Sequence, residues 1–151
     1  MQTVTSVSGG RTSAYLAANY PSDHLLFALV RTENEKSRFP DEAMRKYVED
    51  RLQTEFIGTL EDDQIIYTML ELEQYLGQYI HWVTGPTYEQ VIRNHGGNYL
   101  PNRKERFCTT EMKLIPMFEW WYDNINEPII MQIGYRATEP KRANKALEKT
   151  N

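Results

Sequence analysis

The residues best suited to chemistry lie near the start of the chain, where residues 8–13 read Ser-Gly-Gly-Arg-Thr-Ser. Two adjacent glycines let a phosphate group approach the backbone amides without a Cβ in the way, and the hydroxyl groups and the arginine beside them add hydrogen-bond donors. A helix that starts directly after the glycines contributes a partial positive charge at its N-terminus. The run therefore predicts a phosphate-binding loop made of Ser8, Gly9, Gly10, Arg11, Thr12 and Ser13.

The loop lies between two predicted elements, a strand over residues 3–7 and a helix over residues 13–19 that stops before Pro21. Ligands commonly bind where a parallel strand ends and the next helix begins. The spacing matches neither the Gly-Lys-Ser/Thr of a Walker loop nor the Gly-x-Gly-x-x-Gly of a dinucleotide site. The alternative interpretation is a tight Gly-Gly turn followed by a helix with a Ser or Thr cap.

Apolar patterning divides the rest of the chain into alternating strands and helices. The continuous apolar run over residues 25–30 is typical of a strand buried on both faces. Further strands are predicted over residues 79–83 and 128–133, and further helices from Pro40 onward and over residues 62–76, 87–94 and 109–122, the last with a kink at Pro116. This alternation predicts an α/β fold, three-layer and Rossmann-like, with a mainly parallel sheet covered on both faces by helices. We expect residues 1–151 to form a single nucleotide-binding domain.

Composition excludes several classes of protein. Hydrophobic residues make up 40% of the chain and charged residues 25%, which is typical of a globular protein, and the net charge of −4 disfavours a general nucleic-acid binder. One cysteine, Cys108, excludes an internal disulfide and any four-cysteine metal site. The three histidines are far apart in the sequence and without metal-ligand spacing, so we interpret His24, His81 and His95 as structural or surface residues. No secretory signal or membrane-spanning run is evident, so the sequence predicts a cytoplasmic protein.

Two later segments carry basic residues that could meet an anion. Residues 106–113 read Arg-Phe-Cys-Thr-Thr-Glu-Met-Lys, and residues 133–143 follow the last predicted strand with Arg136, Lys141 and Arg142. Guanidinium groups at the carboxyl end of a strand can bind phosphate oxygens through two parallel hydrogen bonds. The alternative for both segments is a solvated basic surface.

These three segments together resemble a known family. The loop is similar to the PP-loop, Ser-Gly-Gly-x-Asp-Ser, of the N-type ATP pyrophosphatases and the phosphoadenosine phosphosulfate (PAPS) reductase-like proteins. Residues 106–113 resemble the Cys-Thr-x-x-x-Lys segment of that family, and residues 133–143 resemble its Gly-x-Arg-x-x-Glu-x-x-Arg segment. The matches occur in the family's order and cover residues 3–143.

The resemblance implies an adenine nucleotide alpha-hydrolase-like fold that binds ATP, usually with Mg²⁺, and cleaves between the α and β phosphates. It implies catalytic roles for Lys113, Arg136 and Arg142, which would stabilise the leaving pyrophosphate, and nucleotide contacts at Thr32 and Gly134. Glu139 would orient an arginine or bind Mg²⁺. The chain departs from the family at Thr12, where Asp is usual, and in lacking the Glu-Cys-Gly-like tail that supplies the reductases' thiol.

Three functions remain open on the sequence. The first is an ATP pyrophosphatase that adenylates an unidentified second substrate, the second is a PAPS-binding protein of the reductase type, and the third is a non-catalytic module that binds or sequesters a nucleotide. For the site as a whole, the alternatives are that a partner subunit completes it, that a homo-oligomer completes it, or that the chain is a minimal form. The aromatic residues Phe118, Trp120, Trp121 and Tyr122 are interpreted as core or subunit interface rather than as a base-stacking platform.

Overall fold

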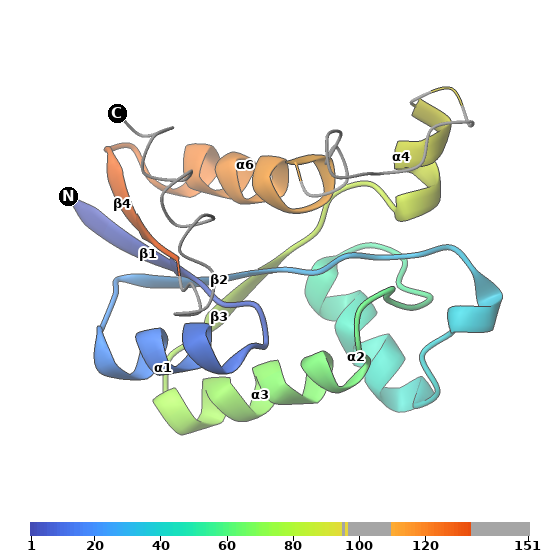
Figure 1. The fold of residues 1–151 in the computed structure, drawn as a ribbon, viewed down its shortest axis with the longest axis horizontal. Coiled ribbons are helices and arrows are strands. Elements are labelled where there is room, and N and C mark those ends of the chain that lie inside the picture. The colour runs from blue at the N-terminus through green and yellow to red at the C-terminus, as the bar shows by residue number, and fades with distance from the viewer. Residues whose placement is uncertain (95, 97–109, 134–151) are drawn as a thin grey trace.

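Four parallel strands form one sheet in the computed structural model, which describes residues 1–94, 96 and 110–133 (Figure 1). The strands are β1 (Gln2–Ser6), β2 (His24–Ala28), β3 (Ile80–Val83) and β4 (Ile129–Gln132), and their order across the sheet is β3-β2-β1-β4. The predicted α/β class and parallel sheet are therefore confirmed. In the described part of the chain, no helix combines the length and apolar character needed to cross a membrane.

The helices alternate with the strands as predicted, with ends that differ by a few residues. They are α1 (Arg11–Asn19), the 3-10 helix η1 (Glu35–Ser37), α2 (Glu42–Leu52), α3 (Gln64–Leu76), α4 (Tyr88–Asn94), the π-helix η2 (Thr110–Leu114) and α6 (Ile115–Asn124). Local signals explain several boundaries. The Asp41 side chain caps α2 by accepting a hydrogen bond from the amide of Met44, and Gly77 ends α3 in the left-handed conformation.

The helix type changes directly before Pro116. Pro116 lies in the first turn of α6, where its fixed φ suits the helix. Instead of one helix through residues 109–122, the chain makes the π-helix η2 and then continues as α6. The wider turn of a π-helix accommodates the change of helix type before the proline.

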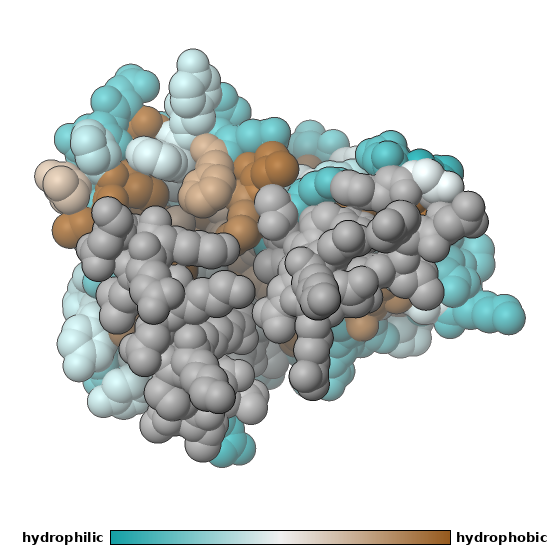
Figure 2. Space-filling view, turned by 45° about the horizontal axis from the view of Figure 1, so that its top comes forward, coloured by the Kyte–Doolittle hydropathy of each residue, from teal (hydrophilic) through white to brown (hydrophobic). Residues whose placement is uncertain are grey.

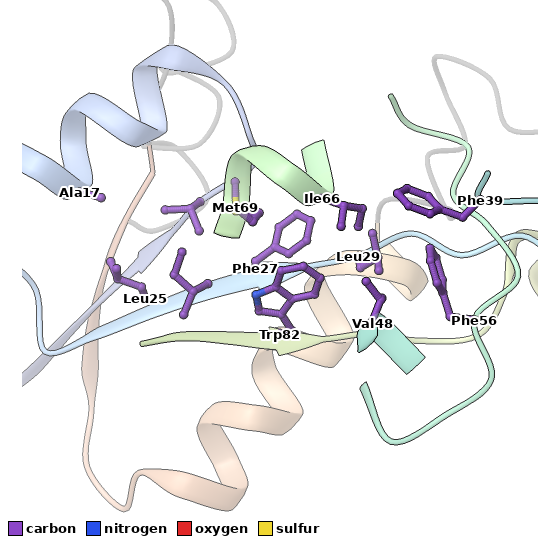
Figure 3. Packing of buried hydrophobic residues seen from close by; sticks show 12 residues of the cluster. Ala17, Leu25, Phe27, Leu29, Phe39, Val48, Phe56, Ile66, Met69 and Trp82 are labelled. Carbon is purple, nitrogen blue, oxygen red and sulfur yellow. The ribbon is translucent and has the colours of Figure 1, made fainter. Parts of the chain in front are cut away.

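One face of the sheet is covered by α1, α2 and α3 (Figure 1). The largest buried cluster lies here, and Phe27 and Trp82 form its centre with their rings edge to face at 5.1 Å (Figure 3). Ile66 and Met69 of α3 pack against these rings, and Val48 brings in α2. Burial of this apolar surface fixes α3 under the sheet and sets the position of its N-terminus.

The opposite face carries α6. Val4, Leu26 and Ala28 point to this side, and Met117 and Ile125 cover them. Trp120 and Trp121 pack against the same cluster and are partly buried, as predicted for core aromatic residues. The other two aromatic residues of the predicted group, Phe118 and Tyr122, are exposed.

Two histidines that are distant in the sequence meet on the side of the sheet covered by α6. The rings of His24 and His81 lie 6.0 Å apart, and both contact Trp120, at 5.3 and 4.7 Å between ring centroids. The parallel pairing of β2 with β3 brings the two histidines together, which their separation in the sequence does not predict. Their packing on Trp120 agrees with the interpretation of these two residues as structural. Burial lowers the pKa of His81, and the charges of His24 and Arg51 lower it further, against an opposing effect of Glu73.

We expect the stability of the fold to decrease as the pH falls through the ordinary histidine range. The unfolded chain accepts a proton at His81 near its usual pKa, whereas the folded protein resists it, so the free energy of unfolding drops between about pH 7.5 and about pH 5.5. Thermal unfolding of the wild type and of His81→Gln measures this. The variant should lose less stability over that range, and an equal loss in both proteins would contradict the role of His81.

Candidate functional site

The predicted phosphate-binding loop joins β1 to α1 as expected. Gly9 has a φ of 83°, and Gly10 is the N-cap of α1 with no side chain to cap the first turn. The alternative of a Ser- or Thr-capped helix is therefore wrong. A helix leaves its first amides without intrahelical partners, and here the amides of Arg11, Thr12 and Ser13 hold those positions. The loop thus presents the donors that an anion requires.

Ser13 shapes the loop from within. Its buried hydroxyl accepts a hydrogen bond from the amide of Ser8 at 3.1 Å and donates one to the carbonyl oxygen of Gly10 at 3.1 Å. The sequence interpretation gave this hydroxyl to a phosphate, but its proton is already donated inside the loop. Ser8, by contrast, is exposed, and Thr12 is half-buried at the start of the helix.

The loop rests on α3. A Cβ at Gly9 would lie 3.1 Å from Cγ1 and Cγ2 of Ile65, so the glycine packs directly on this side chain. No sequence pattern predicts this contact, because it depends on how α3 packs on the sheet. The contact holds the predicted loop against the N-terminal turn of α3. The acidic residues Glu61, Asp62 and Asp63 come directly before this turn in the chain.

The loop also follows β1, the strand from which the chain adds strands to the sheet first on one side and then on the other. The chain continues from β1 to β2 on one side of β1, whereas β4 pairs on its other side, with Thr5 opposite Gln132. Ligands of open α/β sheets bind in the crevice at such a switch point, beyond the carboxyl ends of the strands. The chain leaves β4 beside the loop and leads to Gly134, Arg136 and Arg142. These three predicted site residues lie outside the described part of the chain, as do Cys108 and Glu139.

Lys113 is the predicted catalytic residue that the structure does describe. It lies in η2, and its Nζ forms an ion pair with Oε1 of Glu61 at 2.6 Å. One helical turn further on, Sδ of Met117 lies 3.7 Å from Oγ of Ser6, the last residue of β1. Lys113 therefore lies on the α6 side of the sheet, close to the strand that leads into the loop. Its partner Glu61 was not predicted.

Thr32 is held by the protein rather than open to a ligand. Its amide donates to the carbonyl of Gly58 at 2.9 Å, and its hydroxyl donates to a carboxylate oxygen of Glu89. The other oxygen of Glu89 accepts the amide of Glu33 at 2.8 Å. Thr32 also forms an isolated antiparallel bridge with Gly58 and is only 1% exposed, so its backbone is used within the protein as well.

Arg31 forms hydrogen bonds with the segments around the carboxyl ends of β2 and β3. Its guanidinium donates to Oγ1 of Thr84, to the carbonyl of Gly85 and to the carbonyl of Glu55, at 2.9, 2.6 and 2.9 Å. Burial lowers its pKa, and the carboxylates of Glu33 and Glu55 oppose that effect. These bonds make Arg31 a support of the sheet edge that the predicted site occupies.

The acidic segment beside the loop continues from Glu61 into Asp62 and Asp63. Burial and the neighbouring charge of Asp62 raise the pKa of Asp63. Among the residues that the structure describes, no three side chains of His, Cys, Asp or Glu come together in a way that could hold a metal ion. The described residues therefore do not by themselves provide a Mg²⁺ site, although Mg²⁺ is commonly held by substrate phosphates with one or two carboxylates.

A separate groove of about 1010 Å³ opens along α6, away from the loop. Hydrophobic residues gather on the side of the molecule that α6 covers (Figure 2). The groove combines apolar and acidic side chains, and its lining residues include Ile115, Phe118, Glu119, Trp121, Tyr122, Asp123 and Glu127. Of the predicted site residues that the structure describes, none is among those that line it.

Comparisons of the chain with protein-family models, with curated proteins and with solved structures give no match. A function therefore has to be argued from the loop, the sheet and the side chains around them.

We expect alanine to be more destabilising at Gly9 than at Gly10. Gly9→Ala should lower the free energy of unfolding by about 1–2 kcal/mol, because an L-residue is strained at positive φ and its Cβ presses on Ile65. Gly10→Ala should lower it by less, about 0.5 kcal/mol, because alanine is a poorer N-cap than glycine but its Cβ meets only Oγ of Ser8 at 3.8 Å. Urea unfolding of both variants measures the difference, and equal values would argue against the described turn.

Proposed function

We propose that this protein binds an adenine nucleotide at the carboxyl edge of the sheet, with the phosphates on the loop of residues 8–13. The observation that carries the proposal is the coincidence of three features: the uncapped N-terminus of α1, the glycine turn and the switch point between β1 and β4. The strand order and the helices against both faces also support a three-layer, Rossmann-like arrangement of the adenine nucleotide alpha-hydrolase type.

The proposed reaction is attack of a second substrate on the α phosphate of ATP, with release of pyrophosphate. The loop amides hold phosphate oxygens, and Lys113, once separated from Glu61, neutralises charge on the leaving group. Arg136 and Arg142 add two guanidinium groups from the segment after β4. Mg²⁺, when bound with ATP, supplies further neutralisation of the phosphates. Catalysis by this set consists of positioning and charge stabilisation.

The main alternative is a nucleotide-binding protein without hydrolysis. It is favoured by Thr12, which stands where the family that this chain resembles has Asp, and by the ion pair that holds Lys113 in the described structure. A protein that binds PAPS in the same place is the other alternative, and it would need the same loop contacts. Binding and turnover therefore have to be measured separately.

A negative charge placed in the loop should weaken nucleotide binding without unfolding the protein. Gly10→Asp should keep or raise the thermal midpoint because Asp is a favoured N-cap, and should weaken ATP binding by about tenfold or more because its carboxylate repels phosphate. Titration calorimetry with ATP, AMP and PAPS, each with and without Mg²⁺, measures the effect. Gly10→Asn is the matched control for side-chain size. Unchanged ATP binding in Gly10→Asp would place the nucleotide elsewhere.

Turnover should depend on the segment after β4. If the protein is an ATP pyrophosphatase, Arg136→Ala should lower the rate of pyrophosphate release by about tenfold to a thousandfold, as expected for loss of a group that stabilises the leaving phosphates. A pyrophosphate-release assay on the wild type and the variant tests this. Tight ATP binding without release in the wild type would favour the non-catalytic alternative, and a preference for PAPS would favour the sulfonucleotide alternative.

A further inference from the structure

The ion pair between Glu61 and Lys113 joins the segments that lead into the helices on the two faces of the sheet. Glu61 lies just before α3, which covers one face, and Lys113 lies in η2, which leads into α6 on the other face. The two side chains are 24% and 35% exposed, so water and ions still reach the pair. An ion pair in this position can be exchanged for another partner at small cost.

Both members of the pair are connected to the phosphate-binding loop. Ile65, four residues after Glu61, is the side chain on which Gly9 packs. Met117, four residues after Lys113, contacts Ser6 at the end of β1. The loop therefore packs on α3, which follows the acid in the chain, and the strand before it contacts α6, which follows the base. We expect ligand phosphates on the loop to act on both charges electrostatically.

We propose that Glu61 competes with ligand phosphates for Lys113 and is a specificity-determining residue of the site. This inference rests on the proposed function. In the free protein, the carboxylate neutralises Lys113. To bind, a polyphosphate must replace Glu61 as the partner of Lys113, and the carboxylate of Glu61 then repels the polyphosphate. The penalty grows with ligand charge, so Glu61 weakens the binding of ATP and pyrophosphate more than that of AMP, and leaves adenosine unaffected.

The test is a set of titrations on the wild type, Glu61→Gln, Lys113→Met and the double variant. The ligands are ATP, inorganic pyrophosphate, AMP and adenosine. Glu61→Gln should raise the affinity for ATP and pyrophosphate by about threefold to tenfold, raise that for AMP less, and leave adenosine unchanged. The gain should be smaller in the Lys113→Met background, because no ion pair then has to be broken.

Asp63→Asn is the matched control. It removes a carboxylate at the start of the same helix, and the Asp63 side chain makes no cap hydrogen bond that the change would break. An equal gain in Asp63→Asn would show a general effect of acidic charge and overturn the competition for Lys113. Thermal unfolding checks that each variant is folded, with Glu61→Ala as a second variant in case Glu61→Gln is not.

The outcomes separate this inference from the proposed function. If the wild type binds ATP and Glu61→Gln binds it equally or more weakly, then Glu61 does not compete for Lys113, and nucleotide binding stands without this inference. If neither the wild type nor Glu61→Gln binds ATP or pyrophosphate, both proposals are wrong. If Glu61→Gln gains affinity for pyrophosphate but the wild type does not bind ATP, the competition stands and the assignment of an adenine nucleotide is wrong.

Discussion

The chain turns from β1 into α1 at Gly9, which combines a left-handed backbone with direct packing on Ile65. Both conditions disfavour a Cβ, and together they help to set where α1 begins relative to the sheet. The hydrophobic cluster around Phe27 and Trp82 holds α3 in place, and α3 supports the glycine. The phosphate-binding loop is thus positioned by the core of one face of the sheet rather than by contacts within the loop alone.

The hydroxyl of Ser13 gives the loop its second constraint. By joining the amide of Ser8 to the carbonyl of Gly10, it holds these two residues on either side of the glycine turn. A loop held in its binding conformation loses little entropy when a ligand arrives. In the proposed site, the role of the serine would be to organise the backbone, since its own proton is donated within the protein.

Much of the fold was predictable from the sequence because its signals are local. Apolar runs located β2 and α3, Asp41 and Gly77 marked helix ends, and the Gly-Gly pair located the turn after β1. What the sequence could not show depends on tertiary packing. The meeting of His24 with His81 follows from strand pairing, and the burial of Thr32 follows from the position of Glu89.

The candidate site was predictable to a similar extent. The loop and Lys113 could be named from residue types and order, whereas Glu61 belongs to an acidic stretch in which no residue stands out until the structure pairs it with a lysine more than fifty positions away. The proline at position 116 predicted a departure from a regular helix, but the sequence does not show that this departure takes the form of the π-helix η2 before α6.

The pairing of β1 with β4 has a consequence for how this chain reaches its folded state. Thr5 and Gln132 are 127 positions apart, yet they pair where β4 joins the sheet at its edge. During synthesis, β1 gains this second neighbour only after nearly all the described residues have been made. Such long-range pairing slows folding, and it leaves one edge of β1 open to other strands until β4 arrives. The strand order that places β4 beside β1 therefore makes the nascent sheet dependent on the last of the described strands.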